Sequence, residues 1–513
     1  MIDGKLLTEK LLKYAKTFLS LNERDVIYTR NILLREFGED APADKKDIPD
    51  LSYIERLDVP DELVSEIEKL GVEKGKAVEG LENLYSTYIM GILTPLPSKV
   101  NETFLKIKEK DGIKAACDYF YSLSVKNNYV QKTAIGKNLK WEYEDGAKAL
   151  EITVNLSKPE KNNKDIAKLL TAPQGVKYPA CLLCKENEGF QGTATHPARE
   201  NIRTISLTLG GEPWFVQYSP YAYYNEHLIA VSENHVPMHI KADTVDKLLD
   251  FVDFFPNYMI GSNAALPIIG GSILNHEHFQ GGGHLMPMHN APVKKFFTAK
   301  DFKDVKVGVV DWYNSVIRLE SENRRAIRDF AVRIIESWEK FTDKDCYIFA
   351  ETDGVRHNSL SPICRKNDDT YIIDMILRNN ITNEEYPEGV FHAHPEYHNI
   401  KKEGIGLIEA MGLFILPGRL KKQLGDIAEI LCKKAVYDFD ELSKEDNYLY
   451  AHRFMIKELV EKGYSETFEK AKARVETKVN EVCRDILYNT AVFKNDENGK
   501  KGFARFLKEN GIV

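Results

Sequence analysis

Hydrophobic and polar positions divide the chain into helical ends and a mixed centre. From about residue 8 to residue 123, apolar residues recur at intervals of three and four, which is the spacing of one helix face. Near residue 150 the period changes to the alternation of a strand, in LEITVNL, and from about residue 420 onward the helical period returns. Both ends of the chain are therefore predicted to be helical.

The centre of the chain repeats one order of elements. Between residues 180 and 290, short strand-like runs precede a helix predicted over DTVDKLLDFVDFFPNY, with Asp243 or Thr244 as its N-cap. A second round runs from VKVGVVDWY through the helix ENRRAIRDFAVRIIESWEKF to the strands CYIFAET and TYIIDMILR. The predicted fold class is α+β, with a diverged internal duplication. The predicted domains are a helical N-terminal region (1–165), two halves (166–295 and 296–420) and a helical C-terminal region (421–513).

Composition narrows the class of protein. With 513 residues, 43% of them hydrophobic, the chain can bury a large core. Its formal net charge is −8, with Lys and Arg spread along the chain, which argues against a nucleic-acid partner. We find no signal segment and no apolar run near the roughly twenty residues that cross a bilayer, so we expect a cytoplasmic protein without a membrane partner. The odd number of scattered cysteines argues against a disulfide framework.

The candidate chemistry is concentrated in one stretch, GGSILNHEHFQGGG, at residues 270–283. If SILNHEHFQ is a strand, His276, His278 and Gln280 lie on one of its faces, because side chains alternate. The flanking glycines remove side chains and let backbone N–H groups approach an anion closely. A lone histidine or a glycine run is by itself an ordinary structural feature, but together they indicate a surface suited to a phosphate.

Four segments carry a resemblance to a known family. The H-x-H-x-Q pattern resembles the histidine-triad superfamily, in which the middle histidine attacks an α-phosphorus. CLLCKENEGF, QYSPYAYYNEH, GSILNHEHFQGG and IKKEGIGLIEAMGLFILP together resemble the class II galactose-1-phosphate uridylyltransferases, over essentially the whole chain. The resemblance implies a histidine-triad-like antiparallel sheet with helices, in two copies. It also implies UDP-glucose and galactose 1-phosphate as substrates, a uridylyl-histidine intermediate, no organic cofactor and a homodimer.

The resemblance assigns roles to residues of the glycine-flanked stretch. His278 would be the nucleophile, and one of its ring nitrogens must then be held as N–H, for which a backbone carbonyl is available on a strand. Gln280 would donate to a phosphoryl oxygen. Because an amide is neither an acid nor a base, it favours transfer to a phosphate acceptor over hydrolysis. Four further residues would bind substrate: Asn263, Gly281, Gly282 and Lys402.

Two of these assignments leave alternatives open. Asn263 precedes a proline-containing turn and could equally serve ordinary turn chemistry. Lys402 belongs to the segment with Lys401 and Gly406 that resembles the family's stretch for uridine and sugar phosphate. The matching position of Glu409 in that segment depends on a one-residue shift.

Cys181 and Cys184 raise the question of a metal. Their spacing suits zinc, but one Cys-x-x-C pair is only half a site, and two buried free thiols are the alternative. The resemblance supplies His235 and His276 as the other ligands. Four protein ligands would leave no open position, so the zinc would be structural. A second metal at His392 and His394 also stays open, since the rest of such a site is not apparent.

Two other functions stay open at the level of sequence. One is a different histidine-triad nucleotidyltransferase, such as a dinucleoside polyphosphate phosphorylase. The other is a zinc-stabilised nucleotide-binding protein without turnover, against which the intact HEHFQ stretch argues. Galactose and glucose differ only at C4, and none of these motifs distinguishes them.

Overall fold

The protein divides into two compact units that interleave along the chain. The structure is a computed structural model that describes residues 2–157 and 178–512. Unit 1 comprises Met1–Lys137, Ser157–Val236 and His276–Gly282, and unit 2 comprises Asn138–Leu156, Pro237–Asn275 and Gly283–Val513. The predicted boundary between residues 165 and 166 lies outside the described residues, and the division into four domains stays a prediction.

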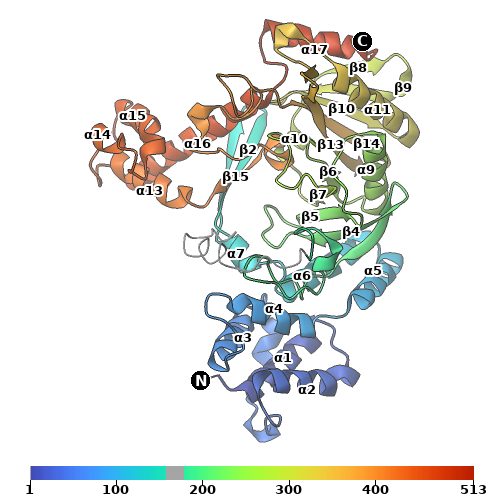
Figure 1. The fold of residues 1–513 in the computed structure, drawn as a ribbon, viewed down its shortest axis with the longest axis vertical. Coiled ribbons are helices and arrows are strands. Elements are labelled where there is room, and N and C mark those ends of the chain that lie inside the picture. Colours follow the sequence, from blue (N-terminus) through green and yellow to red (C-terminus); the bar gives the residue numbers. More distant parts are fainter. Residues whose placement is uncertain (1, 158–177, 513) are drawn as a thin grey trace. The chain divides into compact units, whose positions relative to one another are not determined.

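Unit 1 begins with helices, drawn in blue in Figure 1. In the first of them, Leu7, Leu11 and Ala15 are buried at helical spacing, and the carboxylate of Asp3 caps the helix by accepting from the N–H groups of the following turn. The helical period predicted for this region is confirmed. The helices are α1 (Gly4–Phe18), α2 (Val26–Phe37), α3 (Asp61–Glu73), α4 (Glu82–Leu93), α5 (Pro97–Asp111), α6 (Ile113–Lys126) and α7 (Lys132–Gly136).

Unit 1 also contains four antiparallel strands in the order β3-β4-β5-β7. They are β3 (Ile205–Leu209), β4 (Glu212–Tyr218), β5 (Leu228–Ser232) and β7 (His278–Gly282). Trp214 of β4 stacks on Phe279 of β7, with the ring centroids 4.8 Å apart. This apolar contact fixes one face of β7. The alternation of the strand then assigns His278 and Gln280 to the opposite face.

The strand predicted over SILNHEHFQ is too long, because β7 begins only at His278. The preceding residue, Glu277, donates its N–H to the carbonyl of Val236 at 2.7 Å and accepts from the N–H of Ser232 at 3.1 Å. The bond from Ser232 keeps the register of the β5–β7 ladder, but the N–H of Glu277 leaves the ladder because it donates to Val236. His276 therefore precedes the strand. The alternation of side chains that places His278 and Gln280 on one face does not determine the direction of its side chain.

Unit 2 is built on six strands in the order β6-β13-β14-β10-β9-β8. Helices α9 and α11 contact each other and both pack on β13 (Figure 1). These elements are β6 (Met259–Gly261), β8 (Val293–Ala299), β9 (Phe302–Val310), β10 (Val316–Ser321), β13 (Asn358–Asn367), β14 (Thr370–Asn379), α9 (Ala242–Phe254) and α11 (Arg324–Lys340).

Helix α9 begins at Ala242 with Lys241 at its N-cap, so the prediction of Asp243 or Thr244 as the N-cap is wrong. Thr244 lies inside the helix, and its hydroxyl accepts from the N–H of Lys241.

The rest of unit 2 adds a small sheet, a hairpin and further helices. The small sheet has the order β1-β2-β15, with β15 parallel to β2. Its strands and the hairpin are β1 (Leu139–Asp145), β2 (Lys148–Asn155), β15 (Leu413–Pro417), β11 (Glu351–Thr352) and β12 (Val355–Arg356). The helices are α10 (Pro287–Asn290), α12 (Leu407–Ala410), α13 (Leu420–Leu431), α14 (Phe439–Leu442), α15 (Arg453–Glu461), α16 (Phe468–Thr490) and α17 (Glu497–Glu509).

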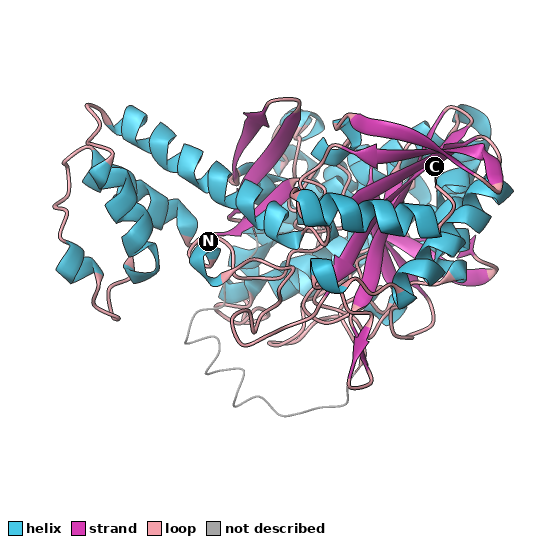
Figure 2. Ribbon diagram, turned by 90° about the horizontal axis from the view of Figure 1, so that it is seen from above, coloured by secondary structure: helices cyan, strands magenta, loops and turns pink. Residues whose placement is uncertain are grey.

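The predicted α+β class is confirmed. Figure 2 shows many helices, in cyan, beside long strands, in magenta. The order β4, β5, α9, β6, β7 along the chain recurs as β9, β10, α11, β13, β14, in keeping with the predicted duplication. In the described ranges, none of the helices has both the length and the apolar character needed to cross a membrane.

Candidate active site

Four side chains of unit 1 form what we call the metal cluster: Cys181, Cys184, His235 and His276. The Sγ of Cys181 lies 3.2 Å from Nδ1 of His276, and the Sγ of Cys184 lies 3.1 Å from Nδ1 of His235. The two sulfurs are 3.5 Å apart. Zn–S bonds of about 2.3 Å and Zn–N bonds of about 2.0 Å in a tetrahedron give ligand–ligand distances of roughly 3.4 to 3.8 Å. The cluster fits a tetrahedral metal after small adjustments.

Hydrogen bonds orient the ligands of the metal cluster. Nε2 of His276 donates to the carbonyl of Ser232 at 2.9 Å, which leaves the lone pair of Nδ1 directed toward the thiols. Asn187 donates to the carbonyls of Cys181 and Cys184, at 2.9 and 2.8 Å, and so holds the Cys-x-x-C turn. Burial and the thiol of Cys181 raise the pKa of Cys184 to about 11. A second thiolate at this place therefore needs a cation beside it.

His278, the first residue of β7, has one ring nitrogen fixed and one available. Its Nδ1 donates to the carbonyl of His276 at 2.8 Å. The proton is thereby held on Nδ1, and Nε2 keeps its lone pair. Only 7% of the residue surface is exposed, and burial lowers the pKa of His278. A neutral imidazole with a fixed tautomer and a free Nε2 is chemically a nucleophile.

Gln280 lies two residues further along β7, on the same face as His278. Its Oε1 accepts a hydrogen bond of 3.1 Å from Nε2 of His227, a residue that the sequence patterns did not single out. Gln280 makes no other side-chain hydrogen bond within the described ranges. The amide N–H groups are thus available to an acceptor that approaches this face.

Of the glycines that follow, Gly282 has a structural reason to be glycine. Gly282 has a φ of +144°, and a Cβ there would lie 2.3 Å from the carbonyl oxygen of Glu226. The carbonyl of Gly281 accepts from the hydroxyl of Tyr224 at 3.0 Å. The close approach explains Gly282 without a ligand, and contact of either glycine with substrate stays a prediction.

The other two predicted substrate residues, Asn263 and Lys402, belong to unit 2. Lys402 is part of the segment 401–409, and Asn263 contacts that segment. Asn263 is buried, and its Oδ1 accepts from the N–H of Leu407 at 2.8 Å. Nζ of Lys401 lies 3.0 Å from Oε1 of Glu409, with side-chain exposures of 7% and 11%. Lys402 differs from its neighbour, because its side chain is 63% exposed and pairs with Glu388 at 3.4 Å. Of the two lysines, Lys401 is the buried one.

Arg378 and His392 join Lys401 and Glu409 around this segment, and we call these four residues the charge cluster. Nη2 of Arg378 donates to the carbonyl of Ile405 at 2.8 Å, and the N–H of Ile405 donates to Nε2 of His392 at 3.1 Å. Burial lowers the pKa of Arg378 to about 10 and that of His392 to about 4. Nε and Nη1 of Arg378 and Nδ1 of His392 find no partner among the described residues. The signal that could have indicated Arg378 is its place, with Asp374, as one of two charged residues in the largely apolar run TYIIDMILR.

A second metal at His392 and His394 finds no support in the described part of the chain. Nε2 of His392 already accepts from a backbone N–H, and Nε2 of His394 donates to the carbonyl of Val390 at 3.0 Å. The ring of His394 stacks on Tyr386 with centroids 3.9 Å apart. The groups of side chains with metal-ligand geometry in the described ranges include neither histidine.

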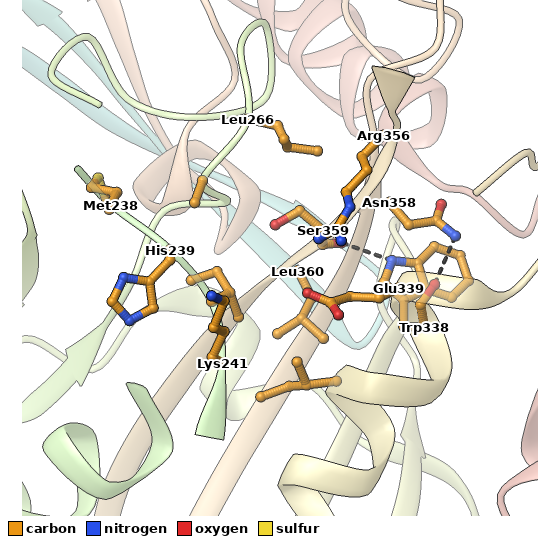
Figure 3. A pocket seen from close by; sticks show the side chains of 13 residues that line it. Met238, His239, Lys241, Leu266, Trp338, Glu339, Arg356, Asn358, Ser359 and Leu360 are labelled. Atoms are coloured by element: carbon orange, nitrogen blue, oxygen red, sulfur yellow. Dashed lines mark hydrogen bonds between the residues drawn. The ribbon is translucent and has the colours of Figure 1, made fainter. Parts of the chain in front are cut away.

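Unit 2 also contains a cavity of about 130 Å³ beside the end of α11 (Figure 3). Three of its lining residues bind one another. Nε1 of Trp338 donates to the carbonyl of Ser359 at 2.7 Å, and Nδ2 of Asn358 donates to the carbonyl of Trp338 at 2.7 Å. These bonds join α11 to β13, and we assign the cavity no chemical role.

Known proteins resemble the chain along nearly its whole length. Residues 20–237 match the family described as galactose-1-phosphate uridyl transferase, N-terminal domain, and residues 251–447 match its C-terminal domain. A galactose-1-phosphate uridylyltransferase of Caldanaerobacter subterraneus subsp. tengcongensis is 44% identical over 99% of this chain and 98% of its own. Proteins of the same name from Fusobacterium nucleatum and Clostridium perfringens are 42% and 41% identical, over 98% and 99% of both chains. No solved structure matches.

Proposed function

The chain belongs to the galactose-1-phosphate uridylyltransferase family, and we propose that it exchanges UMP between glucose 1-phosphate and galactose 1-phosphate through a uridylyl-histidine. The observation that carries this proposal is the environment of His278. Its Nδ1–H donates to the carbonyl of His276, and its Nε2 makes no hydrogen bond within the described residues. A histidine-linked intermediate requires this arrangement.

The reaction has two half-reactions of the same kind. Nε2 of His278 attacks the α-phosphorus of UDP-glucose, the bond from that phosphorus to the bridging oxygen breaks, and glucose 1-phosphate departs. Galactose 1-phosphate then attacks the same phosphorus with a phosphate oxygen, which yields UDP-galactose and restores His278. Glucose 1-phosphate leaves as a stable phosphate anion, and in the second step the imidazole of His278 leaves as a neutral ring that keeps its Nδ1–H, so little proton transfer is needed. The hydrogen bond to the carbonyl of His276 stabilises the positive charge that the ring gains.

Gln280 suits the developing charge on the phosphoryl oxygens. Its amide N–H groups can donate, and an amide cannot activate a water molecule as a base. We propose that it stabilises the transition states of both half-reactions and does not promote hydrolysis.

We propose that the metal cluster holds a structural zinc. Two thiols and two imidazole nitrogens form a typical zinc donor set, and the bond from Nε2 of His276 to Ser232 leaves the lone pair of its Nδ1 available. His276 supplies both a ligand and the carbonyl that orients His278. The zinc would therefore act on the nucleophile through the backbone of His276, without touching substrate.

We propose that segment 401–409 contributes to binding the sugar phosphate. The exposed Lys402 is the candidate for direct contact, and the pair Lys401–Glu409 holds the segment from beneath. Asn263 would then act by fixing the backbone at Leu407.

A coupled assay tests the proposed function. Purified protein with UDP-glucose and galactose 1-phosphate should form UDP-galactose and glucose 1-phosphate with ping-pong kinetics, seen as parallel double-reciprocal lines. Absence of UDP-galactose, or cleavage of a dinucleoside polyphosphate in its place, would contradict the proposal.

A further inference from the structure

His227 makes a direct contact with the side chain of Gln280. It immediately precedes β5, and β5 pairs with β7 so that Leu228 faces Gly281 and Ile229 faces Gln280. This register makes His227 a diagonal neighbour of Gln280 on the same face of the sheet. The residue is 3% exposed, and its Nε2 lies 3.1 Å from Oε1 of Gln280.

The surroundings of His227 determine which of its nitrogens carries the proton. Nδ1 is buried and has no hydrogen-bond partner in the described residues. If the proton were on Nδ1, a buried N–H would lack an acceptor, which is rarer in proteins than a buried lone pair without a donor. The proton therefore belongs on Nε2. Because Nε2–H is a donor, it binds the oxygen of the Gln280 amide, and the amide N–H groups then point away from His227.

The imidazole of His227 is held in place by aromatic rings. Its centroid lies 5.3 Å from that of Tyr223 and 4.6 Å from that of Tyr224. Tyr224 in turn donates its hydroxyl to the carbonyl of Gly281, the residue after Gln280. Burial lowers the pKa of His227 to about 4, so the ring stays neutral, with a single N–H, near neutral pH.

We propose that His227 is a positioning residue for the transfer reaction: its Nε2–H holds Oε1 of Gln280, so that the amide N–H groups are presented to the phosphoryl group. The inference rests on the proposed uridylyl transfer and adds a residue to it. Without His227, Gln280 can rotate and can present its oxygen to a phosphoryl oxygen, which is repulsive. An amide held in one orientation therefore stabilises the transition state more than an amide that can rotate.

A double-mutant cycle tests the proposal. His227→Leu should slow the uridylylation of His278 by UDP-glucose in a single turnover by about tenfold, less than the loss of the donor itself. The KM for UDP-glucose should change much less than kcat, because the donor acts on the transition state. In a Gln280→Ala background, His227→Leu should change the rate by less than about twofold, since the group it positions is gone. His227→Gln, which keeps an N–H donor, should recover most of the rate.

Matched variants separate positioning from packing. His289→Leu replaces another fully buried histidine, one whose ring nitrogens have no partner in the described residues, and should keep the wild-type rate. The cycle is repeated with His227→Phe, which keeps a ring beside the tyrosines, and zinc content and Tm are measured for every variant.

Three results would overturn the inference. The first is a wild-type rate for both His227→Leu and His227→Phe. The second is an effect of His227→Leu that is as large in the Gln280→Ala background as in the wild type, which would mark a packing role. The third is the absence of a UMP adduct on the wild-type protein itself, which would remove the proposed function and this inference with it. The wild-type control thus distinguishes the two failures.

Discussion

The metal cluster of unit 1 and the charge cluster of unit 2 are both buried, but they satisfy their polar atoms differently. In unit 1, Nε2 of His276 and Nδ1 of His278 are each bound to a backbone carbonyl. In unit 2, two nitrogens of Arg378 and one of His392 lack partners among the described residues. Unit 1 therefore has the pattern of a preorganised site for a metal and a nucleophile. Unit 2 has a charged framework that keeps a backbone segment in place.

The largest effect is expected at the proposed nucleophile of unit 1, His278. His278→Gly should reduce transfer on the order of 10⁴-fold or more, because the covalent route is lost, while zinc content and Tm stay close to wild type. His276→Ala should lower zinc content and Tm together with activity, because it removes a ligand. Rate assays and metal analysis of both variants check this. Loss of zinc from His278→Gly, or a full zinc content in His276→Ala, would contradict the assignment of His278 as the nucleophile and His276 as the zinc ligand.

The next effect concerns the stability of unit 2. Lys401→Met leaves the carboxylate of Glu409 buried without its partner, which should cost about 3 to 5 kcal/mol in the free energy of unfolding. Lys402→Met breaks a mostly exposed pair with Glu388 and should cost less than about 1 kcal/mol. Denaturant unfolding of the two neighbouring variants provides the measurement. Equal losses would mean that burial does not distinguish the two lysines.

The variant Lys402→Met also tests whether Lys402 contacts the sugar phosphate. Lys402→Met should raise the KM for galactose 1-phosphate with little change in Tm. If its KM stays at the wild-type value, Lys402 does not contact the sugar phosphate.

A smaller effect is expected when the donor of unit 1 is removed. Gln280→Ala should slow both half-reactions by about 2 to 4 kcal/mol of transition-state free energy, the range for loss of one oxyanion donor. Single-turnover rates with UDP-glucose, and with galactose 1-phosphate after the adduct has formed, measure the two halves separately. Unchanged rates would show that Gln280 does not touch the phosphoryl group.

The remaining effect concerns the pH dependence of stability in unit 2. Burial, together with the nearby guanidinium of Arg365, lowers the pKa of His289 from 6.5 to about 3. Because the folded pKa is depressed, this residue's contribution to stability is complete above pH 6.5 and is lost as the pH falls toward 3.

Comparison with His289→Leu isolates that contribution. Between about pH 6 and pH 4, the free energy of unfolding of the wild type should fall by about 1.4 kcal/mol more per pH unit than that of the variant. Denaturant unfolding of both proteins across this range is the measurement. Parallel pH curves would mean that His289 does not titrate differently in the folded and unfolded chains.

The two clusters also differ in how far the sequence predicts them. Three of the proposed ligands and the proposed nucleophile of unit 1 belong to the short motifs CLLC and HEHFQ, but it was the family resemblance that assigned their roles and supplied His235. The start of β7 was misplaced, because the N–H of Glu277 donates to Val236, a residue of the segment after β5 that no local pattern connects to it. His227 was missed for a related reason: only the register of β5 on β7 brings it to Gln280.

In unit 2 the sequence does not show which charged residues are buried, and this limits the prediction. Two adjacent lysines look alike in the sequence, and only the packing of segment 401–409 makes Lys401 the buried one. Arg378 stands at the end of an apolar strand, and its partner, the carbonyl of Ile405, lies in a loop that no local pattern connects to it. Local periodicity predicted the α+β class and the helical N-terminal region, because those depend on the spacing of apolar residues alone.

The most direct test of the account is to find where UMP becomes attached. Wild-type protein mixed with UDP-glucose alone, without galactose 1-phosphate, should gain one UMP-sized mass increment, and peptide mapping should locate it on His278. The increment should disappear when galactose 1-phosphate is added. An adduct on His276 or any other residue, or no adduct under conditions that support turnover, would contradict the assignment of His278 as the nucleophile.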